Sequence, residues 1–246
     1  MAWEEAKLER MHVWDEGLVT VVFDRVLDDF ESGQFVNLGW EIDGQRIKRQ
    51  YSVASAPGEK AEFFIIKVDN GALTPRIVAM KPGDTCLINP KAAGFFTLKW
   101  IQPTRDLWLV ASGTGLAPFI SLLRTKEPWE RFENIVVLHG VRTASQLGYA
   151  DEMQAHVARS GGRLHYLPIV SREPDAKGVI HGRTTTALAD GQLEKVTGLE
   201  LTPSNAHVML CGNPAMLDEM QAMLEARGLQ VNKRKAPGHI TVERYW

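Results

Sequence analysis

The sequence is poor in cysteine, because its 246 residues contain only Cys86 and Cys211. Two thiols are too few for an iron–sulfur cluster, which normally takes four protein ligands, and they provide no disulfide framework. This composition argues against a built-in iron–sulfur domain, and no metal site is expected. A chain without disulfides is typical of a reducing compartment, so we expect a cytoplasmic protein.

An excess of charge of either sign is also missing, since 28 lysines and arginines balance 30 aspartates and glutamates. The net charge of −2 argues against a dedicated nucleic-acid-binding protein. The N-terminus lacks a basic region followed by an apolar one, so no secretory signal is expected. The apolar stretch Leu107–Leu123 is interrupted by two glycines and a proline, which argues against a membrane span. We therefore expect a soluble protein that binds neither nucleic acid nor membrane. A monomer is also expected.

The N-terminal part of the sequence is typical of a small antiparallel β-barrel. Short segments rich in β-branched and aromatic residues alternate with turn residues, and Asp43-Gly44 is a hairpin signal. One short helix is expected at Thr74–Met80. Six strands of this kind predict a closed or half-closed barrel. They are Val19–Asp24, Gln34–Asp43, Ile47–Ala54, Ala61–Val68, Asp84–Asn89 and Phe95–Leu98.

Beyond about residue 100, apolar strands alternate with helical stretches, which predicts a doubly wound parallel sheet with helices on both faces. The expected strands are Leu107–Ala111, Ile135–Val141, Leu164–Val170 and His207–Leu210, followed by helices that begin near Ala117, Ser145, Thr184 and Pro214. Asn213 is a plausible cap of the last helix and Gly228 its stop. The sequence thus predicts an all-β domain over residues 1–100 and an α/β domain over residues 101–246.

The turn Ser112-Gly113-Thr114-Gly115 lies between an expected strand and an expected helix. Glycines let a ligand approach the backbone, and the start of the helix offers N–H groups and the positive end of its dipole. This arrangement favours a bound anion. A plain tight turn is the alternative, because the motif is neither a Rossmann fingerprint nor a P-loop.

In the expected barrel, Arg49-Gln50-Tyr51-Ser52 ends a strand. An arginine suits a phosphate, a tyrosine ring suits a flat conjugated ligand, and a hydroxyl can bond a ring nitrogen. The alternative is a half-buried strand with an exposed arginine and a core tyrosine.

Three motifs occur in order along the chain: Arg49-x-Tyr51-Ser52, Gly113-Thr114-Gly115-x-x-Pro118 and Cys211-Gly212-Asn213-Pro214. As an ordered set they resemble the ferredoxin–NADP⁺ reductase superfamily. Ala93-Gly94-Phe95-Phe96 and the terminal Glu243-Arg244-Tyr245-Trp246 narrow the resemblance to bacterial ferredoxin/flavodoxin–NADP⁺ reductases, over nearly the whole chain. It implies a six-stranded antiparallel β-barrel that binds FAD, followed by a doubly wound parallel α/β domain that binds NADP(H).

The resemblance also implies roles for individual residues toward FAD. Arg49 would bind a flavin phosphate, Tyr51 would stack on the isoalloxazine, and Ser52 would bond near its reactive N5. Trp246 would stack on the adenine. The helix start at Leu73 and Thr74 would receive the pyrophosphate, in agreement with anion capture by helix ends. The other implied FAD contacts are Gln50, Ile66, Lys67, Val68, Ala93, Gly94, Phe95 and Thr114.

On the nicotinamide side, the resemblance places Thr114 where the nucleotide meets the flavin. Cys211 and Glu243 would flank the nicotinamide and the flavin edge, and with Tyr51 and Ser52 they form the implied reactive site. We expect Cys211 to shape the pocket, because hydride transfer needs no nucleophile. The other implied nucleotide contacts of this kind are Gly113, Gly115, Gly212, Asn213 and Pro214.

Three arginines favour NADP(H) over NAD(H). An NAD site usually binds the ribose diol with a carboxylate, which would repel a 2′-phosphate. Here Arg142 and Arg172 follow expected strands, and Arg183 follows a glycine at an expected helix start. The family reads the 2′-phosphate with arginines at these places, whereas a solvated surface charge is the alternative for any one of them.

The expected activity is the FAD-dependent exchange of electrons between NADP(H) and ferredoxin or flavodoxin. These carriers are acidic, so a basic rim is expected, with Lys99, Arg105 and Lys233-Arg234-Lys235 as candidates and a plain solvated face as the alternative. Two other functions stay open. One is a flavin reductase or oxygenase-component reductase of the same superfamily, and the other is a non-enzymatic flavin-carrying electron-transfer subunit.

Overall fold

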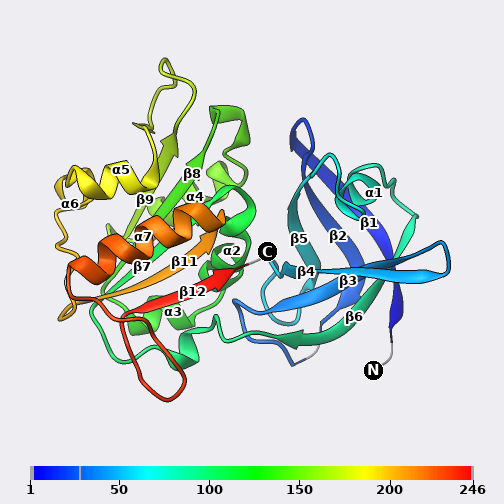
Figure 1. Ribbon diagram of the computed structural model, residues 1–246, viewed down its shortest axis with the longest axis horizontal. Helices are drawn as coiled ribbons and strands as arrows, with labels where there is room; N and C mark the ends of the chain where they lie inside the picture. The colour runs from blue at the N-terminus through cyan, green and yellow to red at the C-terminus, as the bar shows by residue number, and fades with distance from the viewer. Residues whose placement is uncertain (1–2, 28, 245–246) are drawn as a thin grey trace. The chain divides into compact units, whose positions relative to one another are not determined.

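The computed structural model describes residues 3–27 and 29–244 (Figure 1). The chain divides into two compact units. Unit 1 comprises Met1–Thr97 with Ala117–Thr125, and unit 2 comprises Leu98–Leu116 with Lys126–Trp246. Within the described ranges, no helix has the length and apolar character needed to cross a bilayer.

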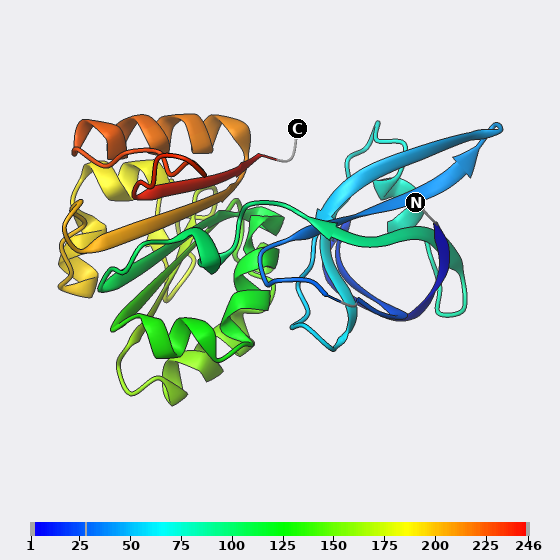
Figure 2. The same ribbon diagram turned by 90° about the horizontal axis from the view of Figure 1, so that it is seen from below.

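Unit 1 is built on a six-stranded antiparallel sheet with the strand order β4-β3-β6-β1-β2-β5. The strands are β1 (Glu4–Asp15), β2 (Leu18–Val26), β3 (Phe35–Ile42), β4 (Gln45–Ser52), β5 (Lys60–Ile66) and β6 (Thr85–Ala93). The sheet curves around a core that includes Phe23, Leu38 and Phe63 (Figure 2). Just beyond β4, the Ala54 N–H donates to the Glu62 carbonyl of β5 (2.8 Å), so the two edges approach each other as in a half-closed barrel.

Several predicted features of this unit are confirmed. Helix α1 (Thr74–Val78) begins at the predicted residue, and the hairpin between β3 and β4 turns at Asp43 and Gly44, whose φ angles of 50° and 74° are both left-handed. Two such residues are the signature of a type I′ turn, which matches the twist of the flanking strands.

In unit 1, one strand was missed and one predicted strand is wrong. Strand β1 was not predicted, although it pairs with both β2 and β6. Phe95–Leu98 is not a strand, because the Phe96 backbone packs closely on Gly33. A Cβ atom at Gly33 would lie 1.9 Å from the Phe96 carbonyl oxygen, and the Phe96 ring packs on Phe119, with 5.7 Å between ring centroids.

Helix α2 (Ala117–Leu123) belongs to unit 1 and is fixed there by buried polar contacts. The Ser121 hydroxyl donates to the Ser55 carbonyl (2.7 Å). Just after the helix, Arg124 Nη1 donates to the Glu62 carboxylate (3.1 Å). Buried polar groups that are satisfied in this way specify one packing of the helix.

Unit 2 is a parallel six-stranded sheet with the order β10-β9-β8-β7-β11-β12. The strands are β7 (Asp106–Ser112), β8 (Asn134–Val141), β9 (Leu164–Val170), β10 (Ile180–His181), β11 (Ala206–Gly212) and β12 (Ile240–Arg244). Helices α5 (Thr184–Ala189), α6 (Gln192–Thr197) and α7 (Pro214–Ala226) cover one face, and α3 (Glu127–Arg131) and α4 (Ala150–Arg159) cover the other (Figure 2). The predicted doubly wound fold is therefore confirmed.

Helix α7 follows its sequence signals closely. The Asn213 side chain accepts from the N–H groups of Ala215 (3.0 Å) and Met216 (3.4 Å), and Gly228 has a φ of 86° just after the end of the helix. These are the expected cap and stop.

One prediction for unit 2 is wrong, and some of its strands were missed. The helix expected from Ser145 is only a 3₁₀ turn, η3 (Ala144–Gln146), because Tyr149 adopts a left-handed φ of 62° and α4 starts only after it. The two edge strands, β10 and β12, were not predicted.

Candidate functional site

The end of strand β4 presents an exposed arginine beside a half-buried tyrosine. Arg49 and Gln50 are exposed, Tyr51 is half-buried and Ser52 is buried. The Tyr51 ring lies edge-on to Phe63, with 6.4 Å between the ring centroids.

The Tyr51 hydroxyl is buried and has no hydrogen-bond partner among the described residues. Burial raises the pKa of Tyr51 to about 12; the Arg49 charge lowers the pKa and the nearby Cys86 raises it. The side chain is therefore a neutral phenol with an unused donor. Because buried polar atoms are normally bonded, this hydroxyl is suited to bind a ligand.

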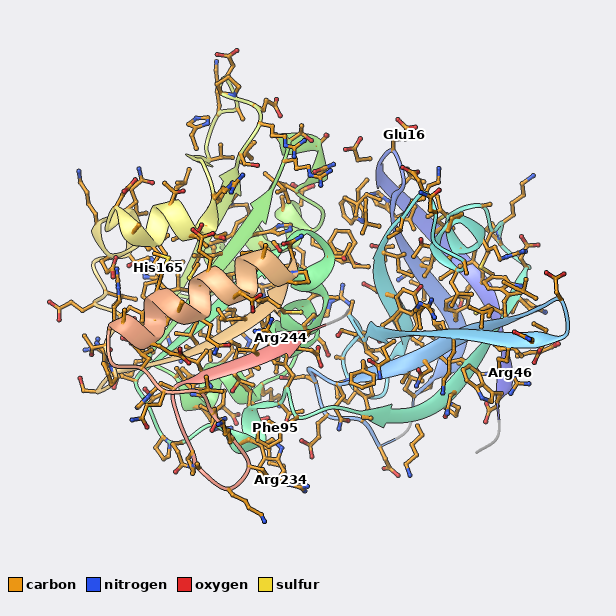
Figure 3. All side chains as sticks on the ribbon, viewed as in Figure 1. Glu16, Arg46, Phe95, His165, Arg234 and Arg244 are labelled. Atoms are coloured by element: carbon orange, nitrogen blue, oxygen red, sulfur yellow. The ribbon has the colours of Figure 1, made fainter. Side chains whose placement is uncertain are left out.

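Strands β4 and β6 end at Ser52 and Ala93, at the same end of the sheet. Both residues pair with Phe35 of β3, one from each side. Gly94, which follows with a φ of 124°, and Phe95, which is labelled in Figure 3, continue from this end. The structure thus places the predicted residues at the ends of β4 and β6 in one row.

The loop after β5 is closed by Thr74. The Val68 N–H donates to the Thr74 hydroxyl (2.8 Å), and the Leu73 side chain is buried in the core. Ile66 ends β5, and the Lys67 ammonium lies 3.3 Å from the Asp69 carboxylate. The side chains of Leu73 and Thr74 are thus engaged within the protein, which leaves backbone groups for any anion here.

In unit 2, the two glycine-containing turns meet backbone to backbone. A Cβ atom at Gly115 would lie 2.3 Å from the Cys211 carbonyl oxygen. A Cβ atom at Gly212, whose φ is 137°, would lie 2.3 Å from the Ser112 hydroxyl oxygen. That hydroxyl accepts from the Asn213 N–H (2.8 Å). Both glycines are therefore required by close approach, and the two motifs form one structure.

Cys211 and Glu243 lie side by side. Cys211 pairs with Glu243 of β12 and with Ala111 of β7, and Ala111 pairs with His139 of β8. Paired residues of parallel strands point to the same face, so these four side chains form one row, which we call the Cys211 row. Cys211 is fully buried and Glu243 is 8% exposed.

The Cys211 row faces away from helices α5 to α7. Val110 and Leu210, the preceding residues on β7 and β11, belong to the core that contains α5 and α7 residues. Because side chains alternate along a strand, Ala111 and Cys211 point to the opposite face. Half-buried Thr114 lies between the two glycines of the turn that follows β7.

His139 was not predicted from the sequence as a site residue. Its side chain is fully buried, and its Nε2 atom lies 3.1 Å from the Gly113 carbonyl oxygen. Its Nδ1 atom lies 3.4 Å from the Tyr166 hydroxyl. The available signal was a histidine inside an otherwise apolar strand.

The three predicted arginines lie at the carboxyl ends of neighbouring strands. Arg142 follows β8 and Arg172 follows β9 by two residues, and the Arg172 N–H donates to the Arg142 carbonyl (2.8 Å). Arg183 occupies the N-cap position of helix α5, just after β10, and its side chain makes no capping hydrogen bond. All three side chains are exposed. Ligands of doubly wound folds bind at this edge of the sheet.

The residues predicted to form a basic rim differ in their surroundings. Arg105 makes a two-bonded ion pair with the buried Asp106 carboxylate (3.0 and 2.8 Å), so its charge is compensated. Lys99 Nζ lies 5.7 Å and Arg234 Cζ 5.0 Å from the centroid of Trp100, which brings two predicted cations to one aromatic ring. Figure 3 shows Arg234 on the loop before β12.

Trp246, which was predicted to stack on the adenine of FAD, lies outside the described residues. In the described part of the chain, no group of three or more histidine, cysteine, aspartate or glutamate side chains is arranged to hold a metal ion.

Comparisons with known proteins match the C-terminal part of the chain to a domain family and nearly the whole chain to individual proteins. Residues 109–222 match the family model of an oxidoreductase NAD-binding domain. The chain is 38% identical to a flavodoxin/ferredoxin–NADP reductase of Escherichia coli (strain K12), over 99% of both chains. It is 37% identical to a ferredoxin–NADP reductase of Azotobacter vinelandii, over 95% of this chain and 94% of that one.

Among solved structures, a ferredoxin NADP⁺ reductase from Neisseria gonorrhoeae with bound FAD and NADP matches with a TM-score of 0.93. The sequence identity is 28%, and the match covers 99% of both chains.

Proposed function

Because the chain belongs to the flavodoxin/ferredoxin–NADP reductase family, we propose that it is an FAD enzyme that exchanges electrons between NADP(H) and a ferredoxin or flavodoxin. The observation that carries this proposal is the backbone contact between Gly115 and Cys211, which joins two predicted motifs into one cradle. Only a residue without a Cβ atom allows the two turns to approach each other this closely.

Unit 1 has groups that fit FAD. The Tyr51 hydroxyl is a buried donor that no described residue uses, and exposed Arg49 is suited to a phosphate. Bound FAD would accept a hydride at N5 and pass electrons on singly, which is chemistry of the cofactor. We propose that Tyr51 and Ser52 position the flavin ring, and that backbone groups near Thr74 and Gly94 contact the rest of the cofactor.

Unit 2 would hold the nicotinamide nucleotide. The Gly113–Gly115 turn offers its backbone, and the buried Cys211 and Glu243 provide a dry wall beside it. We propose that Thr114 and these two side chains orient the nicotinamide and exclude water. Orientation is the main contribution that a protein makes to hydride transfer between two bound rings.

We propose that Arg142, Arg172 and Arg183 make the protein selective for NADP(H) by binding its 2′-phosphate. Guanidinium groups bind phosphate through charge-assisted hydrogen bonds. The Glu173 carboxylate beside them accepts from the Ala144 N–H (2.7 Å), so it is held by the backbone of the neighbouring turn. The exposed arginines are thus the groups that a 2′-phosphate would meet.

We propose that the acidic electron carrier binds at a surface formed by Lys99, Trp100 and Arg234, which we call the Trp100 patch. The loop that carries Arg234 is well fixed at its base. The Asn232 side chain donates to the carbonyl of Trp100 (3.1 Å) and accepts from the Gly238 N–H (3.0 Å). A fixed cationic patch around an aromatic ring suits an acidic protein surface.

Reversing both charges of the Trp100 patch, in the double variant Lys99→Glu with Arg234→Glu, should slow reduction of an acidic ferredoxin by about 10-fold at low salt, because steering attraction is lost. Reduction of an uncharged quinone should not change. The matched control is Lys195→Glu, an exposed lysine on α6. Stopped-flow measurement at two salt concentrations checks this, and an equal loss with the quinone would contradict the assignment.

The proposed activity is tested by coupling the protein, loaded with FAD, to NADPH and a ferredoxin or flavodoxin that reduces cytochrome c. Carrier-dependent reduction supports the proposal. Rapid consumption of NADPH with added flavin and no effect of the carrier would favour a flavin reductase instead. If the flavin-loaded protein reacts with neither NADPH nor NADH, the result would favour a non-enzymatic flavin-carrying subunit.

We also propose that the protein acts as a cytoplasmic monomer. The support for the location is compositional, since two cysteines in 246 residues suit a reducing compartment. Cell fractionation tests the location, and light scattering of the purified protein tests the oligomeric state.

A further inference from the structure

The His139 side chain connects the second strand of the parallel sheet to the turn that follows the first strand. Its Nε2 atom lies 3.1 Å from the Gly113 carbonyl oxygen and its Nδ1 atom 3.4 Å from the Tyr166 hydroxyl. The imidazole is fully buried, in the same row as Ala111 and Cys211. Two partners from two different elements hold the ring in one orientation.

Chemistry determines which nitrogen carries the proton. A carbonyl oxygen can only accept, so Nε2 must be the donor toward Gly113. Burial lowers the pKa of His139 to about 4, and the bond to Gly113 partly offsets this effect. The ring is therefore neutral at neutral pH, Nδ1 carries a lone pair, and the Tyr166 hydroxyl donates to it. Burial also raises the pKa of Tyr166, which keeps that donor protonated.

The hydrogen bond from His139 Nε2 to the Gly113 carbonyl holds the peptide group between Gly113 and Thr114. This group is planar, so the direction of the Gly113 carbonyl also fixes the direction of the Thr114 N–H. Gly113 has a left-handed φ of 53°, and a Cβ atom there would meet nothing within 4 Å. The space beside the Gly113 Cα atom is therefore open, whereas Gly115 is in close contact with the Cys211 backbone.

We propose that His139 is a positioning residue for nicotinamide nucleotide binding: it orients the Gly113–Thr114 peptide, and Tyr166 fixes the required tautomer. This inference rests on the proposed function. The contacts of His139 are to the Gly113 carbonyl and the Tyr166 hydroxyl, so it would act on the nucleotide through the turn. The nucleotide turn is thus contacted at two points, by the Cys211 backbone at Gly115 and by the His139 side chain at Gly113.

The test compares His139→Leu, which removes the donor, with His139→Gln, whose amide can replace Nε2–H. The matched control is His165→Leu on neighbouring β9 (His165 is labelled in Figure 3). His165 pairs with Val136, which belongs to the core on the opposite face of the sheet. Each FAD-loaded variant is titrated with NADP⁺ by flavin difference spectra, and its reduction by dithionite serves as a nucleotide-independent control.

His139→Leu should weaken NADP⁺ binding by about 10-fold, because a misdirected turn loses aligned contacts. His139→Gln should remain within about 3-fold of wild type, Tyr166→Phe should weaken binding by about 2- to 3-fold, and His165→Leu should have no effect. Reduction by dithionite should be the same for all variants. If His139→Leu and His139→Gln weaken NADP⁺ binding equally, only the shape of the imidazole matters and the proposal is overturned. Binding of NADP⁺ with wild-type affinity by both variants would also overturn it.

A separate measurement covers the case in which His139→Leu fails to fold. Nitrogen-15 NMR of the wild-type imidazole should show a neutral ring protonated at Nε2, and protonation at Nδ1 would overturn the proposal. Failure of the proposed function is distinguishable. A wild-type protein that binds no NADP⁺ overturns that function together with this inference, whereas a wild type that binds with unaffected variants overturns this inference alone.

Discussion

Replacing Gly115 with alanine should slow the reduction of bound FAD by NADPH by about 100-fold or more, because a displacement of about 1 Å in a positioning turn has effects of this size. The new Cβ atom would lie 2.3 Å from the Cys211 carbonyl oxygen and 2.6 Å from its carbon. Both are backbone atoms of a central strand, which cannot move aside by changing a rotamer. The turn must therefore shift relative to Cys211. Anaerobic stopped-flow measurement of flavin bleaching by NADPH checks this result.

Gly161→Ala is the matched control for this prediction, because it adds the same methyl group in the turn between α4 and β9, outside the proposed site. A Cβ atom at Gly161 would meet nothing within 4 Å, and the cost is the left-handed φ of 62°, about 1–2 kcal/mol of stability. The rate of bleaching should hardly change. A Gly115→Ala protein that is bleached as fast as wild type would contradict the assignment of this turn to the nucleotide.

The second large effect concerns the arginines at the ends of β8 and β9. The double variant Arg142→Ala with Arg172→Ala should lower the preference for NADPH over NADH by about 100-fold or more, since a hydrogen bond to a charged group contributes about 1.5–3 kcal/mol. The constants for NADH should hardly change, because NADH has no 2′-phosphate. Steady-state kinetics with both nucleotides measures the ratio. Arg183→Ala should move it in the same direction.

Arg159→Ala is the control for the arginine variants. Arg159 is an exposed arginine near the end of α4, where its Nε donates to the Ala155 carbonyl (3.2 Å). Removing its charge should leave the preference for NADPH unchanged. If the double variant weakens NADPH and NADH equally, the 2′-phosphate assignment is wrong.

Much of the fold could be predicted from local signals. Strand β9 was predicted with its observed bounds, and α7 with its cap and its stop, because apolar runs and capping residues act over short distances. Strand β1 was missed because most of its residues are polar and its stability comes from pairing with β2 and β6. Phe95–Leu98 was predicted as a strand because it is apolar, but Phe96 is buried by contacts distant in sequence.

The candidate site shows the same division. The motifs around Gly113 and Cys211 could be recognised in the sequence, but their backbone contact depends on the register between β7 and β11. His139 could not be separated from an ordinary core histidine, because its two partners come from other elements. Arg105 was predicted as part of the basic rim, and only the structure shows its ion pair with Asp106.

The central claim is that one protein holds both FAD and NADP(H), with the nucleotide at the Gly115–Cys211 cradle. The most direct test is an anaerobic titration of the FAD-loaded protein that follows the visible flavin bands as NADPH, and separately NADH, is added. We expect NADPH to bleach the bands at a concentration at least about 100-fold lower than NADH, as expected for arginines that bind the 2′-phosphate. A protein that takes up no FAD, or flavin bands that neither nucleotide bleaches, would contradict the account.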